Sequence, residues 1–363
     1  MIPYGRQEVT DDDILQVKRV LRSNFLTQGP VVPKFEKAVT EYCGVDYGVA
    51  VNSATSALHI ACLALNLGPG DWLWTSANTF VASANCALYC GANIDFIDID
   101  PKTYNMCITS LSNKLSKAEK LGKLPKIIIP VHFAGQPCDM LKIQNLSKKY
   151  GFKIIEDASH AIGSSFNKVK TGSCKYSDIT IFSFHPVKII TTGEGGIALT
   201  KNKKLSNKMK RLRSHGITRD KKMMKARPKN EIWNYQQIEL GFNYRITDLQ
   251  ASLGLNQLKR LNKYVRIRHE IAKQYNNKLK DLAVELPFQF PKSFSSYHLY
   301  PIRVRKNLTG PSQKKDYISL HEKKIYANII YIPVHRHPFY ENLGFKKNDF
   351  PEAEKFYKEV ICL

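Results

Sequence analysis

Residues 178–200 read DITIFSFHPVKIITTGEGGIALT, and this stretch decides which fold the chain is expected to adopt. Its first part, residues 179–184, is apolar, β-branched and aromatic, which predicts a buried strand. A turn carrying one lysine, Lys188, comes next, followed by the glycine-rich reversal at 193–196 and a second strand at 197–200. Lys188 is therefore expected at the mouth of a sheet, among apolar residues.

A lysine in such a turn can acquire unusual chemistry. A solvated lysine has a pKa of about 10.4 and is protonated at neutral pH. When it is held beside residues such as Phe184, Pro186 and Val187, it can lose solvent, become a neutral nucleophile and form a Schiff base. An ordinary surface lysine is the competing interpretation in so basic a chain, so the assignment of Lys188 depends on neighbouring motifs.

Two earlier segments supply groups that pyridoxal phosphate needs. Residues 152–155 predict an apolar strand that ends near Asp157, at the edge where α/β sheets bind ligands. A carboxylate facing the ring nitrogen keeps the pyridinium protonated, so Asp157 is the candidate, although capping a turn is an ordinary role for Asp. Residues 47–51 lead into NSATSALHI at 52–60, whose small hydroxyl residues can cradle a phosphate at a helix start or simply cap the helix.

Together these motifs resemble the sugar-nucleotide aminotransferases of the DegT/DnrJ/EryC1/StrS family. The similarity runs from about Ile2 to the end and rests on NSATSALHIA, TFVASAN, EDASHAIG, SFHPVK with GEGG behind it, GFNYR and YIPVH. Within the family, IPYGRQ, SNFLTQGPVV, VNSATSALHIACLALNLGPGD, TFVASANCALYCGA and SFHPVKIITTGEGG are most similar to the 4-aminotransferases of pseudaminic acid synthesis. The resemblance implies fold type I, with an α/β large domain like that of aspartate aminotransferase at 1–245 and a smaller α+β domain at 246–363.

The resemblance also implies a cofactor site shared within a homodimer. Lys188 would hold pyridoxal 5'-phosphate and act as the catalytic base. The other implied cofactor contacts are Ala54, Thr55, Ser56, Phe80, Asp157, His160, Ser183, Asn243 and Arg245. In the family, the loop that carries the last two crosses the dimer interface to the partner's phosphate site.

Structural interpretations compete with several of these assignments. Core packing is the default for Phe80, and a strand residue such as Ser183 can simply face solvent. His160 departs from the glutamine that many relatives have, and a packed histidine explains it as well. Asn243 can equally cap the helix that follows it.

For the substrates, the resemblance implies glutamate as amino donor, released as 2-oxoglutarate, and a UDP-linked 4-keto-6-deoxy-N-acetylhexosamine as acceptor. The implied sugar-nucleotide contacts are Tyr4, Asn24, Phe25, Leu26, Thr27, His185, Ile329, Ile330, Tyr331 and Ile332. Ile330 stands where relatives usually carry histidine. An aminotransferase for another nucleotide-linked keto sugar is the nearest alternative.

Composition leaves other classes to weigh. The 363 residues are 43% hydrophobic, enough for two cores, and the formal net charge is +24. A basic nucleic-acid-binding regulator would explain that charge, but the lysines are dispersed and no recognisable DNA- or RNA-binding motif is present, so no nucleic-acid partner is expected. A Schiff-base lyase would use Lys188 without needing Asp157 and the cradle, and related dehydratases carry histidine in place of the lysine.

The location is expected to be cytoplasmic. The opening residues 1–6 lack an apolar signal region, and no later run approaches the roughly 20 apolar residues of a membrane helix. The eight cysteines are scattered, and Cys86 and Cys90 lie one helical turn apart, so packing explains them better than metal or disulfides. We therefore expect neither a metal nor a membrane partner.

The remaining elements follow from periodicity. Strands and helices should alternate over 47–200, which indicates a mostly parallel sheet with helices on both faces. Beyond it we expect one long helix from about Thr247 to Leu279. The last third should hold strands at 297–304 and 325–332 around a helix at 312–323. The chain stops where relatives continue through a further strand and helix, which suggests a truncated form.

Overall fold

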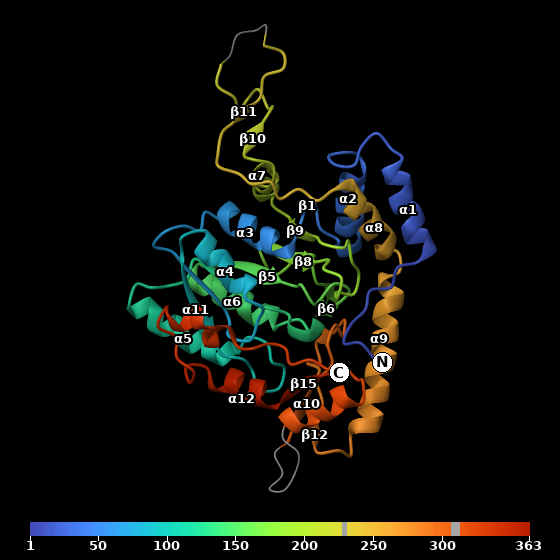
Figure 1. The fold of residues 1–363 in the computed structure, drawn as a ribbon. Helices are drawn as coiled ribbons and strands as arrows, with labels where there is room; N and C mark the ends of the chain where they lie inside the picture. The colour runs from blue at the N-terminus through green and yellow to red at the C-terminus, as the bar shows by residue number, and fades with distance from the viewer. Residues whose placement is uncertain (227–230, 306–312) are drawn as a thin grey trace.

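The computed structural model describes residues 1–226, 231–305 and 313–363. Its centre is a seven-stranded sheet of order β1-β9-β8-β5-β4-β2-β3 (Figure 1). The strands are β1 (Tyr47–Val51), β2 (Trp72–Ser76), β3 (Asn93–Ile97), β4 (Ile127–Ile129), β5 (Lys153–Asp157), β8 (Ile179–Ser183) and β9 (Gly196–Thr200). Neighbouring strands run parallel except where β9 pairs with β1 and β8. The predicted mostly parallel α/β sheet is confirmed.

Helices cover both faces of this sheet. The covering helices are α2 (Val31–Cys43), α3 (Ala54–Ala64), α4 (Ala82–Tyr89), α5 (Ile108–Lys120), α6 (Met140–Tyr150), α7 (Lys203–Arg213) and α8 (Asp248–Leu258). Because side chains alternate along a strand, Ile181 belongs to the core cluster that includes residues of α3 and α4, whereas Phe182 belongs to the one that includes residues of α2 and α8. Every residue of β8 is buried, so each large apolar side chain stabilises the fold by about 1.5–3 kcal/mol. This layering fixes where the strand ends lie.

A hairpin projects from the body beyond α7 (Figure 1). Its strands β10 (Ile217–Thr218) and β11 (Gln236–Gln237) pair antiparallel, and a bridge between Ser214 and Asn243 closes its base. We call its described residues, 214–226 and 231–243, the arm. Large apolar side chains are exposed along it, including Trp233 at 72% and Leu240 at 78%. Such exposure indicates an interaction surface.

The last third forms a smaller layer below the sheet (Figure 1). Strands β12 (Val284–Glu285), β14 (Pro301–Val304) and β15 (Val360–Cys362) pair antiparallel. Its helices are α9 (Leu261–Leu279), α10 (Gln313–Glu322), α11 (Pro338–Glu341), α12 (Pro351–Glu359) and the 3-10 turn η2 (Val334–Arg336). A domain boundary at 245 stays a prediction, because other elements tie the two parts together.

Two contacts make that connection. Strand β13 (Ser293–Phe294) extends the small sheet of β6 (Ser165–Phe166) and β7 (Val169–Lys170). At the N-terminus, before α1 (Asp11–Leu21), Ile2 forms a bridge with Ile325. The first residues of the chain are thereby brought across to its last third.

The prediction of a single helix over 247–279 is wrong. The chain turns at 259–260 between α8 and α9. A buried carboxylate on α1, that of Asp13, accepts hydrogen bonds from Asn256 at 2.8 Å and from Arg260 at 2.6 Å, which holds this turn. Even the 19-residue α9 is too polar to cross a bilayer, and no other helix of the described residues is long and apolar enough.

Both expected C-terminal strands are also corrected. The strand predicted at 297–304 begins only at Pro301, because Arg268 draws the carbonyls of Tyr297 and His298 toward itself. The segment 325–332 makes only isolated bridges, since it touches the edge of β15 at a single residue and then turns toward a cavity. The expected helix at 312–323 is present as α10, although its first residue lies outside the described ranges.

Candidate active site

A cavity of about 680 Å³ opens at the carboxyl ends of β5 and β8. It brings together side chains from the N-terminal segment, α3, both strand ends and residues 328–331. Of the site residues predicted from the sequence, those lining it are Tyr4, Ala54, Thr55, Phe80, Asp157, His160, Ser183, His185, Lys188, Ile330 and Tyr331. These residues are far apart in the sequence, and the sheet topology makes them neighbours.

Lys188 sits in a tight turn after β8. Its backbone N–H donates to the carbonyl of His185 at 2.9 Å, and Thr192 closes the loop by donating to the carbonyl of Phe184 at 3.0 Å. Although the lysine faces the cavity and keeps some exposure, dense surrounding protein lowers its pKa to about 8, against the opposing charge of Asp157. Roughly a tenth of such an amine is neutral at pH 7, far more than for a solvated lysine.

Asp157 is the last residue of β5 and is buried. One carboxylate oxygen accepts a hydrogen bond from Ser83 Oγ at 2.6 Å, and the other accepts from the N–H of Ser159 at 3.0 Å. These two donors come from different sides and fix the plane of the carboxylate. Its charge acts on Lys188, so the acid and the amine face one cavity within electrostatic range.

The start of α3 forms a second wall. The N–H groups of Ala54 and Thr55 have no acceptor among the hydrogen bonds of the described residues. A side chain at Gly196 would come within 2.5 Å of the Ala54 nitrogen, so glycine allows β9 to approach this helix start. Free N–H groups at the positive end of a helix suit a phosphate.

The mouth of the cavity is aromatic. The exposed ring of Phe80, with 55% of the residue accessible, lies 5.9 Å from the Tyr331 ring. The Tyr331 hydroxyl lies 3.0 Å from Nε2 of His160, while Nδ1 of His160 is buried without a hydrogen-bond partner among the described residues. Burial and the charge of Lys188 hold the pKa of His160 well below its usual value, so its ring is neutral.

Other predicted residues lie outside this cavity. The hydroxyl of Ser56 donates to Asn52 Oδ1 at 2.7 Å and so supports the cradle from within. Ser183, by contrast, is buried and does line the cavity, which excludes the solvent-facing interpretation. Within the segment 329–332, only the two central residues reach the cavity, and Ile332 is exposed elsewhere.

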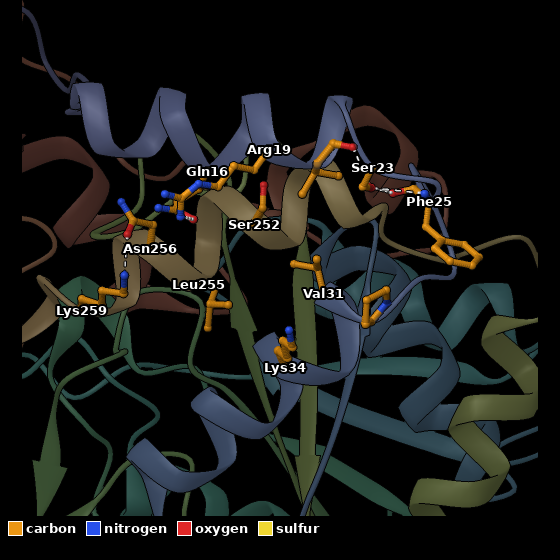
Figure 2. Close-up of a pocket in the computed structure, with 12 residues that line it drawn as sticks. Gln16, Arg19, Ser23, Phe25, Val31, Lys34, Ser252, Leu255, Asn256 and Lys259 are labelled. Atoms are coloured by element: carbon orange, nitrogen blue, oxygen red, sulfur yellow. Dashed lines mark hydrogen bonds between the residues drawn. The ribbon is translucent and has the colours of Figure 1, made fainter.

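The loop Asn24–Thr27 also lies away from the cavity. Leu26 accepts a hydrogen bond from the N–H of Asp248, and Phe25 lines a separate pocket of about 310 Å³ between α1, α2 and α8. Figure 2 shows this pocket, with Phe25 at one end and Lys259 at the other. The two cavities share no lining residue.

Asn243 and Arg245 approach the same end of α8. Asn243 pairs with Ser214 at the base of the arm, and the backbone of Arg245 pairs with Val51 at the end of β1. Neither side chain lines the cavity of its own chain. The loops 24–27 and 243–245 therefore meet at the N-terminal end of α8. There Asp248 accepts hydrogen bonds from the N–H groups of Val31 and Val32, the first residues of α2.

Several lining residues were missed from the sequence. The polar ones are Asn52, Ser53, Thr79, Ser159, Glu194 and Asn328. The first five lie inside or beside the motifs quoted above, so their positions next to the assigned residues were an available signal. Asn328 lies in an irregular segment with no such signal.

The residues present fit pyridoxal phosphate. The cavity offers an amine of lowered pKa for an aldehyde, a carboxylate for a ring nitrogen, free N–H groups for a phosphate and an exposed aromatic ring for stacking. Within the described residues, no cluster of three or more His, Cys, Asp or Glu side chains is arranged to hold a metal ion. The donor set thus matches an organic phosphate.

Known proteins share this sequence and fold. Residues 7–363 match the DegT/DnrJ/EryC1/StrS aminotransferase family. The UDP-4-amino-4,6-dideoxy-N-acetyl-beta-L-altrosamine transaminase of Campylobacter jejuni is 39% identical, over 100% of this chain and 92% of the relative.

Solved structures agree with that assignment. PseC of Helicobacter pylori, an aminotransferase involved in the biosynthesis of pseudoaminic acid, superposes with a TM-score of 0.88 at 32% identity, covering 100% of this chain and 93% of PseC. The proposed sugar aminotransferase Spr1654 of Streptococcus pneumoniae, in its PMP form, gives 0.89 at 29% identity, covering 100% and 94%. The chain is therefore a pyridoxal phosphate-dependent sugar aminotransferase of the DegT/DnrJ/EryC1/StrS family.

Proposed function

We propose that the protein transfers the amino group of glutamate to C4 of a UDP-linked 4-keto-6-deoxy-N-acetylhexosamine, a step of pseudaminic acid synthesis. The names of the C. jejuni and H. pylori proteins support this choice of sugar. The observation that carries the chemistry is the placement of Lys188 and Asp157 in one cavity, with a free helix start beside them. A volume of about 680 Å³ also leaves space for more than the cofactor alone.

The roles proposed for individual residues follow from their surroundings. When bound, pyridoxal phosphate stores the amino group between donor and acceptor. Lys188 Nζ would hold the cofactor aldehyde and later take the proton from Cα of the donor, which requires the neutral amine that burial favours. Asp157, oriented by Ser83 and Ser159, would keep the ring nitrogen protonated.

The walls of the cavity would position the cofactor. Ala54 and Thr55 would bind its phosphate through their N–H groups, with Ser183 beside them. The neutral His160 has a free Nδ1 to offer the ring hydroxyl, while its other nitrogen is held by Tyr331. Phe80, exposed at the mouth, would stack on the ring.

The proposal includes a homodimer with shared sites. The loops Asn24–Thr27 and 243–245 lie outside the cavity of their own chain, although the family resemblance assigns both to the active site. Both are anchored at the start of α8, next to the arm with its exposed Trp233 and Leu240. A second copy covering this face would bury the apolar arm and receive both loops.

The product assay tests the proposed substrate. The purified protein is incubated with glutamate and the UDP-linked 4-keto sugar, and the products are analysed by mass spectrometry and NMR. The proposal requires an amine at C4 of the sugar and one equivalent of 2-oxoglutarate. If only a differently linked keto sugar, such as a GDP-linked one, is aminated, the alternative acceptor is correct and the pseudaminic acid assignment is lost.

A further inference from the structure

A second cavity, of about 300 Å³, lies on the other side of the catalytic lysine turn. Lys188 lines both this cavity and the larger one. The lining residues of the second cavity that carry polar side chains are Arg6, Gln7, Glu8, Lys188, Thr191, Gln257, Tyr264 and Arg268. We call it the Arg268 cavity.

Arg268 is a half-buried cation without a counter-charge among the described residues. Its Nη1 donates to the carbonyls of Tyr297 and His298 at 3.0 and 3.1 Å. No carboxylate of the described residues forms an ion pair with it, and its Nε and Nη2 have no hydrogen-bond acceptor there. Burial lowers the pKa of Arg268, in line with its half-buried position.

Five of the other arginines that are buried or half-buried form ion pairs, while Arg245 forms none among the described residues. The short ion pairs are Arg211 with Glu239, Arg213 with Glu36, Arg260 with Asp13, and Arg303 with Glu359. A half-buried charge without a partner is solvated less well than an exposed one. An arginine that keeps two free donors beside a cavity is therefore arranged to bind an anion that the chain itself does not supply.

The Arg268 cavity is connected to the reaction centre through Tyr4. The Tyr4 hydroxyl is buried without a hydrogen-bond partner among the described residues, and Tyr4 lines the larger cavity. Burial raises the pKa of Tyr4 well above its usual value, and the charge of Arg268 opposes this shift, so the two side chains are near one another. His298 is affected by both Lys188 and Arg268, although burial is the main cause of its lowered pKa.

A second cation lines the same cavity. Residues 2–7 lie against the catalytic turn, since a side chain at Gly5 would be 3.9 Å from Cβ of Val187. This places Arg6 on the wall of the Arg268 cavity, and Arg6 forms no ion pair within the described residues. With Lys188, the lining carries three basic groups against the single carboxylate of Glu8. The cavity therefore favours an anion.

We propose that the Arg268 cavity binds the side-chain carboxylate of the amino donor, with Arg268 as the principal contact and Arg6 as the second. This inference rests on the proposed function and specifies how its donor is chosen: a dicarboxylic amino acid places its amine at Lys188 and its distal carboxylate on the guanidinium. The other anionic group among the proposed substrates is the diphosphate of the acceptor. The smaller volume of this cavity favours the compact carboxylate over a nucleotide.

Binding to the holoenzyme distinguishes these two anions. Titration calorimetry with glutarate, which has both carboxylates but no amine, should show binding, whereas butyrate should bind much more weakly. Arg268→Gln should weaken glutarate binding about tenfold or more, because a charge-assisted hydrogen bond is lost. Binding of UDP should change less than about twofold. Weakened binding of UDP with unchanged glutarate would assign the cavity to the nucleotide and overturn the proposal.

The donor half-reaction gives a second readout that needs no sugar. Glutamate alone should bleach the cofactor absorbance of the wild type, and Arg268→Gln should need at least about tenfold more glutamate for half the maximal rate. The maximal rate should fall less. This result can be obtained even if the acceptor sugar is misassigned, so the two proposals fail separately.

Matched variants separate an effect on glutarate binding from an effect on folding. Arg266→Gln changes an exposed arginine on the same helix and should leave glutarate binding unchanged. Arg268→Lys keeps the charge and should recover part of the binding. If Arg268→Gln does not fold, Arg6→Gln decides, because Arg6 is exposed: about threefold weaker glutarate binding supports the proposal, and unchanged binding overturns it.

Discussion

Two groups of residues that the resemblance assigns to the site lie in different places. Residues following β1, β5 and β8, such as Thr55, Asp157 and Lys188, meet in one cavity of the single chain. Residues in the two loops at the start of α8, Asn24–Thr27 and 243–245, lie outside it. The sheet places the first group, because parallel strands end at a common edge. We propose that the second group acts in the cavity of a partner molecule.

The largest expected effect falls within the first group. Lys188→Ala should lower transamination by more than about 10³-fold, because both the covalent anchor and the base are lost. Steady-state kinetics on the variant measure this, and a melting temperature close to that of the wild type confirms its folding. A variant that retained even a few per cent of the activity would move the reaction away from this cavity.

Asp157→Asn should cost about 10²- to 10³-fold in kcat, since a neutral amide cannot stabilise a protonated ring nitrogen. Ser83→Ala removes one of the two hydrogen bonds that orient the carboxylate, so its loss should be smaller, about tenfold. Comparing kcat for the two variants separates the charge from its orientation. Equal activity of Asp157→Asn and wild type would refute the assignment of the acid.

Mixing two impaired variants tests the second group. Arg245→Ala should lose about tenfold or more in activity, because a phosphate contact is removed. If Arg245 acts in the partner's site, a mixture with Lys188→Ala contains mixed dimers with one intact site. After unfolding and refolding together, activity should recover to about a quarter of the wild type.

The control for mixing is the pair Asp157→Asn and Lys188→Ala. Because Asp157 and Lys188 line one cavity of one chain, every site in that mixture keeps a defect, and no recovery is expected. Recovery in neither mixture would place Arg245 with its own chain, and the comparison between the two groups would no longer hold.

The rate at which the apo-protein captures pyridoxal phosphate should depend on pH. Burial lowers the pKa of Lys188 to about 8, so its ammonium form predominates below that pH and cannot attack the aldehyde. The rate should rise about tenfold per pH unit up to pH 8 and then level off. In Asp157→Asn the midpoint should shift lower, because the charge that raises this pKa is gone. A midpoint near 10 would describe a solvated lysine instead.

The smallest expected effect concerns His132, which pairs with Glu156, the residue before Asp157. Burial opposes the charged form of His132, but its interaction with Glu156, at 2.8 Å, raises its pKa to about 10. Protonation is thus stronger in the folded state, so this contribution is complete below pH 6.5 and is lost as the pH rises to about 10. The melting temperature should fall by roughly a few degrees over that range. His132→Gln should weaken this dependence, whereas a substitution at the partly exposed His337 should not.

Local patterns predicted the central sheet well because its strands are continuous apolar runs with glycine-rich turns. The break between α8 and α9 could not be predicted locally, since it depends on Asp13, which lies more than 240 positions earlier. The segment 325–332 has strand-like composition, yet only isolated bridges form there. Within the described residues, His160 Nδ1 has no hydrogen-bond partner and Arg268 has no ion pair. Neither fact could be predicted from the sequence, because both depend on which residues the fold brings nearby.

Reductive trapping identifies the amine that binds the cofactor. Borohydride treatment of the coloured holoenzyme fixes the cofactor to the amine that holds it, and peptide mass mapping then identifies that residue. The account predicts a pyridoxyl group on Lys188 and on no other lysine. Label on a different lysine, or none after full reconstitution, would contradict it.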